Sequence, residues 1–298
     1  MIAHFYIVSE SFARNDRTSL EDIERKIKKQ TNKIYVNYDE LYPQIFYINY
    51  TMEEFVCEPL RLKQEGVDRD IIASVQKILD RSSQTTVTNA EVLSELINWN
   101  DGNDCHGVLV FNKINGLDEN FQVVYDKGSW LKFRRYFLSL YPKNAVFFVE
   151  ECEKYFPEII FHPQIRDTIG ALLADCPVKI IYHLSALNDN FRLSQQRGFN
   201  RTQVLQHFSA NNGLDETASL EGNASRKKAF TFSFTEKDKK TETDKTIEVC
   251  CEPHMKLCYN DYYPGDNSYS TDRRIYFHEG MTGFLDGKIL LGHIGSHL

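Results

Sequence analysis

The feature that most constrains the fold is a change in hydrophobic pattern near residue 213. Before this point, short apolar runs of β character alternate with segments whose apolar residues recur at helical spacing. Residues 210–225 are rich in Asn, Gly, Ser, Asp and Glu, and every later apolar run is short and strand-like. We therefore predict an α+β fold, with a larger mixed α/β domain at 1–213, a linker, and a small β-rich C-terminal module at 226–298.

Local patterns predict the individual elements of both parts. Strands or extended segments are expected where β-branched and aromatic residues cluster, and helices where apolar residues return every three or four positions. The predicted extended segments are 4–9, 41–50, 107–112, 121–125, 145–149, 159–162, 229–234, 246–251, 274–278 and 288–293. The predicted helices are 20–29, 70–81, 90–99, 130–140, 164–173 and 201–209.

Composition narrows the class of protein. The net charge of −7 argues against a protein that coats DNA along its whole surface, although a local basic site remains compatible with it. No apolar run approaches 18 residues, so no membrane partner is expected. The seven cysteines are odd in number and no secretory segment precedes them, which favours free thiols and a cytoplasmic location. No phosphate loop or dinucleotide fingerprint is present, so no cofactor is predicted.

Reactive side chains concentrate in the C-terminal module. Four of the nine histidines lie after residue 253, together with basic and tyrosine side chains at the ends of predicted strands. Neighbouring strands of a sheet lie about 5 Å apart, so their ends can assemble a site. The candidate catalytic residues are His254, Lys256, Arg273, Arg274, Tyr276, His278, His293 and His297.

These side-chain types suit cleavage of RNA without a metal ion. A His or Lys removes the proton of the ribose 2′-hydroxyl, an Arg or Lys stabilises the developing charge, and a His or Tyr protonates the leaving oxygen. DNA lacks this internal nucleophile. The alternative interpretation is structural: His293 and His297 end the last strand and bond backbone groups, while Tyr276 belongs to the core.

The C-terminal strands also carry a resemblance to a known family. A Pro-His-x-Lys-Leu segment at 253–257, an Arg-Ile-Tyr-Phe strand at 274–277 and a terminal Ile-Leu-Leu-Gly-His-Ile strand at 289–294 resemble the closing sheet of RelE/HigB-type ribosome-dependent RNase toxins. The same region resembles uncharacterised bacterial proteins found among mobile defence genes. The resemblance covers about 70 residues and implies a bacterial RNase effector with a role in antiviral defence and RNA as its partner.

Three other hypotheses remain open from the sequence. Cys251, His254, Cys258, His293 and His297 together offer enough ligands for tetrahedral zinc. In the larger domain, 125–127 and 148–151 place acids after apolar runs, where a magnesium-dependent nuclease keeps its carboxylates. The aromatic content of the C-terminal module also fits a non-enzymatic subunit that binds a partner protein through a β edge. Whether the chain is an enzyme is therefore left open at this stage.

Overall fold

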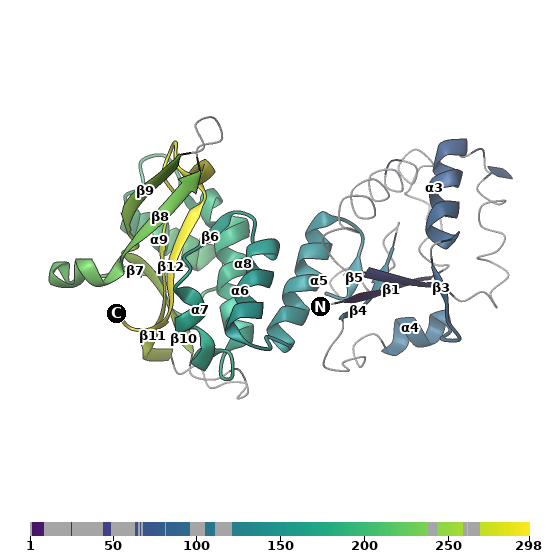
Figure 1. The fold of residues 1–298 in the computed structure, drawn as a ribbon, viewed down its shortest axis with the longest axis horizontal. Coiled ribbons are helices and arrows are strands. Elements are labelled where there is room, and N and C mark those ends of the chain that lie inside the picture. The colour runs from purple at the N-terminus through teal and green to yellow at the C-terminus, as the bar shows by residue number, and fades with distance from the viewer. Residues whose placement is uncertain are drawn as a thin grey trace. The chain divides into compact units, whose positions relative to one another are not determined.

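The computed structural model divides the chain into two compact units, Met1–Phe137 and Leu138–Leu298. It describes residues 2–8, 25, 44–48, 63–64, 66, 68–80, 82–95, 105–110, 121–237, 243–258, 261 and 269–298. Each unit contains helices and its own β-sheet (Figure 1). The predicted mixture of α and β structure with a β-rich C-terminal part is confirmed.

The first unit is built on a parallel sheet. Its five strands follow the order β3-β2-β1-β4-β5, and every neighbouring pair is parallel. Parallel neighbours require crossover connections, and the helices α3 and α4 precede and follow β3 along the chain. The elements are β1 (Ala3–Ile7), β2 (Gln44–Ile48), α3 (Arg69–Asp80), β3 (Ser83–Gln84), α4 (Asn89–Glu95), β4 (Cys105–Leu109), β5 (Val123–Val124) and α5 (Lys127–Leu140).

Both faces of the central strands in this sheet are covered. On one face, the ring of Phe5 in β1 lies 5.0 Å from that of Phe133 in α5. The other face contributes Val8, Val108 and Val110 to a buried cluster with Val92 of α4. This burial on both faces is typical of parallel sheets. The predicted helix at 130–140 is confirmed, and those at 70–81 and 90–99 are confirmed as far as Asp80 and Glu95, where each described stretch ends. The helix predicted at 20–29 lies outside the described residues except for Arg25.

The second unit contains a mixed five-stranded sheet in the order β6-β12-β11-β10-β7. Strand β12 is parallel to β6 and antiparallel to β11, while β10 is antiparallel to both β11 and β7. A separate hairpin pairs β8 with β9. The strands are β6 (Ile159–Phe161), β7 (Ser219–Leu220), β8 (Thr231–Lys237), β9 (Asp244–Cys250), β10 (Pro253–Cys258), β11 (Tyr269–His278) and β12 (Ile289–Ser296).

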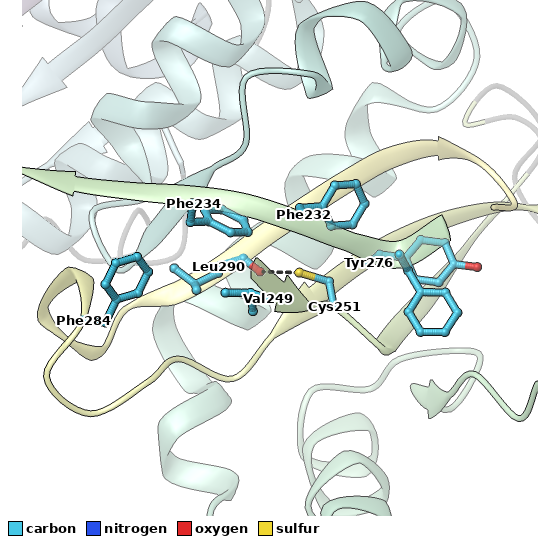
Figure 2. Packing of buried hydrophobic residues seen from close by; sticks show 8 residues of the cluster. Phe232, Phe234, Val249, Cys251, Tyr276, Phe284 and Leu290 are labelled. Carbon is cyan, nitrogen blue, oxygen red and sulfur yellow. Dashed lines mark hydrogen bonds between the residues drawn. The ribbon is translucent and has the colours of Figure 1, made fainter. Parts of the chain in front are cut away.

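The hairpin packs on one face of this sheet. Phe232 and Phe234 of β8 belong to a buried apolar cluster with Leu290 of β12. Figure 2 shows these side chains together with Val249 and Cys251, and Tyr276 lies at one end of the group. A methyl group on Gly292 would lie 2.3 Å from the Phe232 ring, so glycine at this position permits the close approach. The hairpin therefore forms an additional layer on this face of the sheet.

Helices cover the opposite face. Phe191 of α8 packs edge-on against Phe277 of β11, at 5.4 Å between ring centroids, and against Phe208 of α9. The helical elements are α6 (Ala145–Tyr155), α7 (Ile165–Thr168), a 3-10 turn (Gly170–Leu172), α8 (Pro177–Ser194), α9 (Arg201–Asn211), and two 3-10 segments, η5 (Ala224–Phe230) and η6 (Leu285–Gly287). Within the described ranges, no helix combines the length and the apolar character that a membrane crossing requires.

Two sequence-based predictions need correction. Residues 145–149 form the start of helix α6, with Asn144 as its N-cap, and not a buried strand. The predicted linker at 210–225 contains β7, which pairs with β10, and the strands after residue 226 join β6 in one sheet. The β-rich C-terminal part is therefore not a separate module, because its sheet is completed by strands from before residue 226.

Candidate functional site

Three of the predicted site residues, His254, His293 and His297, meet around a fourth, Tyr276. In the sheet, Tyr276 of β11 is directly opposite His254 of β10 on one side and His293 of β12 on the other. Directly paired residues of an antiparallel sheet share a face, so the three rings are neighbours. Their centroids lie 5.3 Å (His254) and 6.1 Å (His293) from that of Tyr276, and the ring of His297 lies 6.5 Å away. We call these four residues the imidazole cluster.

Most of the imidazole cluster is buried. Tyr276 is 0% exposed, His293 3% and His254 6%. Burial, reinforced by the charge of Arg274, lowers the pKa of His254 to about 4, so its ring is neutral at pH 7. Burial also raises the pKa of Tyr276 to about 12, with the charge of Glu221 adding to the effect. The cluster is therefore reached from solvent through its fourth member, His297.

The protonation of His293 follows from its partner. Its Nε2 lies 2.8 Å from the backbone carbonyl oxygen of Ser296, which can only accept a hydrogen bond. Burial lowers the pKa of His293, although this carbonyl partly offsets the effect. The ring is thus a neutral imidazole with its proton on Nε2. Because this N–H is bonded to the Ser296 carbonyl, it is not available to donate to solvent, and His293 has a structural role.

A Glu–His–Arg group lies at the solvent end of the cluster. Glu221 directly follows β7, and its backbone N–H bonds the carbonyl of Glu252 just before β10. Its Oε2 lies 3.2 Å from His297 Nε2 and accepts a hydrogen bond from the Tyr276 hydroxyl at 3.3 Å. The Nη1 of Arg226 lies 3.4 Å from Nδ1 and 3.5 Å from Nε2 of His297, so it is near both ring nitrogens. We call Glu221, Arg226 and His297 the polar triad.

The chemistry of the partners assigns the tautomer of His297. A carboxylate only accepts a hydrogen bond, so Nε2 of His297 carries the proton toward Glu221, and Nδ1 is the ring nitrogen that can accept one. Burial alone would raise the pKa of Glu221, but the hydrogen bond from His297 and the neighbouring imidazoles outweigh it and lower that pKa. The His297 side chain is 27% exposed and that of Glu221 13%. This pair therefore combines an ionised carboxylate with an imidazole that reaches solvent.

A cavity opens beside Glu221. It has a volume of about 350 Å³, and its walls include Glu221, Lys227 and His278. His278, another predicted site residue, therefore faces the same cavity as Glu221, although its Nδ1 accepts a hydrogen bond from the backbone of Gly280. Burial lowers the pKa of His278. Of the polar triad, Glu221 is the residue that lines this cavity.

The remaining predicted residues lie apart from the triad. Lys256 forms an ion pair with Glu216 at 3.1 Å, and Arg273 forms one with Asp175 at 2.5 Å. Arg274 is 7% exposed and donates to the carbonyl of Arg273. The structure thus brings His254, Tyr276, His293 and His297 together, while these three cations support the surrounding scaffold.

The five residues of the zinc hypothesis do not gather. Cys251 is buried among the apolar side chains under the hairpin, with its thiol against the carbonyl of Leu290. Cys258 ends β10 and contacts Asp261. Across the described part of the chain, no three His, Cys, Asp or Glu side chains are arranged to hold a metal ion. The zinc hypothesis is therefore wrong for this structure, because the sheet places the thiols away from the imidazoles.

The acids of the larger predicted domain also have structural roles. Asp126 caps the start of α5 by accepting from the backbone N–H of Ser129 at 2.7 Å. Glu150 and Glu151 lie on helix α6 and not at a strand end, and Glu151 accepts from Tyr155 and Lys154. Among the described residues, these acids belong to no group of three side chains that could hold a metal ion.

Sequence analysis missed Glu221 and Arg226. Glu221 lies in the polar stretch that was interpreted as a linker, and Arg226 was treated only as the start of the following module. The two-residue strand β7 brings Glu221 to the sheet, and η5 brings Arg226 to His297. No spacing motif marks either residue, because both contacts are made across more than 70 positions of sequence.

No protein-family model, curated protein or solved structure matches the chain.

Proposed function

We propose that this protein is a bacterial effector that cleaves RNA without a metal ion, acting through the polar triad. The observation that carries the proposal is that His297 contacts the Glu221 carboxylate through Nε2, while the Arg226 guanidinium lies within 3.5 Å of both nitrogens of the His297 ring. A carboxylate that holds one nitrogen of an imidazole fixes the tautomer and the orientation of the ring. Arg226 supplies the positive charge that a phosphodiester requires.

The reaction follows from these roles. A phosphate bound by Arg226 lies beside the His297 ring, whose Nδ1 carries no proton and is able to accept one. His297 then removes the proton of the ribose 2′-hydroxyl, while Glu221 stabilises the imidazolium that forms. The 2′ oxygen attacks phosphorus, the bond to the 5′ oxygen breaks, and the leaving oxygen takes a proton from water. The hydroxide that forms then accepts the proton held by His297, which restores the neutral ring. The products are a 2′,3′-cyclic phosphate and a 5′-hydroxyl.

The buried residues of the imidazole cluster have a positioning role in this proposal. Tyr276 keeps its proton because its pKa is about 12, and it donates to Glu221. His254 contacts Ser219 Oγ at 3.2 Å and packs on the Tyr276 ring. Both residues therefore hold the carboxylate in place and do not touch the substrate. The resemblance of the C-terminal strands to RelE/HigB-type toxins and to defence-associated proteins supports RNA as the substrate and a role in antiviral defence.

A cleavage assay with matched substrates tests the proposal. The purified chain is incubated with a labelled single-stranded RNA and with DNA of the same sequence, with and without a chelator. We expect cleavage of RNA alone, unaffected by the chelator, with cyclic phosphate ends. Glu221→Gln and His297→Ala should each lower the rate by about 10²- to 10⁴-fold. Glu153→Gln serves as control, because Glu153 forms an exposed ion pair with Arg166. Cleavage of DNA, or full activity in both triad variants, would refute the proposal.

A specific observation favours one second candidate, a non-enzymatic subunit that binds a partner protein. In the described residues, β8 and β9 pair only with each other, so each strand presents an unpaired outer edge. Such edges can accept a strand from another protein. A stoichiometric complex with an identified partner, together with no turnover of RNA, would favour this candidate over the enzyme.

A further inference from the structure

Three cavities adjoin one another across the second unit. The cavity beside Glu221 shares Arg201 with a cavity of about 540 Å³, and it shares Met281 with one of about 420 Å³. The latter two have Gln195 and Glu279 in common. We call the three together the Arg201 groove. It extends from the turn that precedes α9 to Glu221 of the polar triad.

The floor of the Arg201 groove is fixed by ion pairs. Arg201 contacts Glu279 through Nε at 2.7 Å and Nη2 at 3.1 Å, and its Nη1 lies 2.9 Å from Glu252. The bonds to Glu279 raise the pKa of Arg201. These contacts tie the first residue of α9 to the segments beside β10 and β11. Arg201 is thus committed to the scaffold, and its single positive charge offsets part of the negative charge of Glu252 and Glu279.

Two other cations of the groove remain available to a ligand. Arg197 lines the 540 Å³ cavity and Lys227 lines the cavity beside Glu221. Both side chains are exposed, and neither forms an ion pair with any residue that the structure describes. When an exposed basic residue without an acidic partner binds a phosphate, no existing ion pair has to be broken. The groove therefore offers two anion contacts in separate cavities.

An aromatic side chain is presented beside Arg197. Phe199 is 38% exposed and lines the 540 Å³ cavity. Gly198 adopts φ +91°, in the region that glycine tolerates best, and the Phe199 N–H bonds the carbonyl of Gln196. The Phe199 ring packs edge-on against His207, with 5.5 Å between centroids, and His207 is bonded to the Gln196 amide. These contacts hold Phe199 at the surface in one position.

We propose that the Arg201 groove binds single-stranded RNA, with a base stacked on Phe199 and phosphates at Arg197 and Lys227. This inference rests on the proposed function, since it names the form of RNA that the polar triad receives. Exposed aromatic rings interleaved with cations are the means by which proteins bind unpaired strands, because every base has a face that can stack. Bases within a duplex are already stacked on each other, so Phe199 distinguishes the two forms.

Binding can be measured separately from cleavage. A fluorescent single strand with 2′-O-methyl groups lacks the nucleophile, so its affinity for the full chain reports the groove alone. We expect Phe199→Ala to weaken binding by about 5- to 100-fold, the range that one base–aromatic stack contributes. Phe199→Trp should restore it. Arg197→Ala should lower the slope of log affinity against log salt concentration by about 0.7, as expected for one phosphate contact on a single strand.

A matched control separates stacking from general surface effects. Leu193 is 75% exposed and is absent from the walls of the three cavities, so Leu193→Ala should leave affinity unchanged. Circular dichroism verifies that each variant is folded. Equal affinity for the single strand and a duplex, or equal affinity of Phe199→Ala and Leu193→Ala, would overturn the inference. Binding without cleavage of ordinary RNA would instead support the groove and refute the proposed catalysis.

Discussion

His254 is kept neutral by its surroundings, and this has a consequence for acid stability. Its pKa falls from 6.5 to about 4 because the ring is buried beside Arg274. Between these two values the unfolded chain binds a proton that the folded chain does not, so the free energy of unfolding decreases as the pH falls from 6.5 to 4. The contribution of His254 to this loss is about 3 kcal/mol. Above pH 6.5 this destabilising contribution of His254 is absent.

Urea unfolding of wild type and His254→Gln at several pH values tests this prediction. The variant should lose less stability than wild type between pH 6.5 and pH 4, whatever its stability at neutral pH. His183 is also buried, its pKa is about 3, and it adds a loss of the same sign in both proteins. His207→Gln is the control, because His207 is only partly buried. Parallel pH profiles for wild type and His254→Gln would contradict the assignment.

Single residues of the site also show what sequence reasoning can and cannot find. The types of His254, Tyr276, His293 and His297 marked them as candidates, and the sheet does bring them together. Their access to solvent was not predictable, since burial depends on the hairpin and on η5 packing over the same face. Glu221 has an unremarkable sequence context and becomes a candidate only through its contacts with His297 and Tyr276.

At the scale of elements, the hairpin β8–β9 is the layer that closes the site. Phe232 and Phe234 are buried against the sheet, whereas Ser233 between them is exposed. This alternation is the period of a strand with one covered face. The hairpin therefore depends on its inward aromatic side chains for its attachment to the sheet.

Replacing one of these aromatic side chains should weaken the whole unit. Phe232→Ala removes a ring that packs over Gly292 and leaves a cavity, so we expect a loss of about 3 to 5 kcal/mol in the free energy of unfolding. Ser233→Ala, one position along on the outward face, should change it by less than about 0.5 kcal/mol. Chemical denaturation measures both. Similar values for the two variants would mean that the hairpin does not pack as described.

Helix α6 shows why one element was predicted incorrectly. Its first residues, 145–149, are all apolar, and a short apolar run does not distinguish a buried strand from a buried helix. The distinguishing signal was Asn144, whose side chain accepts from the backbone N–H of Phe147 and caps the helix. By contrast, 70–81 and 201–209 alternate apolar and polar residues at helical spacing, and both predictions are confirmed.

For the whole molecule, the pairing of β6 with β12 determines which fragments of the chain can fold. Strand β12 lies between β6 and β11, and β10 lies between β11 and β7. The residues after 226 therefore lack two strands of their sheet and also the helix α8 that covers it through Phe191. The second compact unit, by contrast, contains all of these elements.

Two fragments test this description. Residues 138–298 should fold alone and unfold cooperatively, whereas residues 226–298 should remain unfolded because their sheet has no partner on either edge. Circular dichroism and amide proton dispersion in NMR spectra measure both outcomes. A folded 226–298 fragment would restore the separate module that the sequence pattern predicted.

The sequence by itself determined the types and positions of most elements and the region where reactive side chains gather. These properties follow from local periodicity and side-chain chemistry, which neighbouring residues express without help from the rest of the chain. Only the tertiary structure decided where the chain divides, which histidines meet, and that Glu221 and Arg226 join them. Those outcomes depend on strand pairing between distant segments, and pairing partners leave no periodic signal in a single sequence.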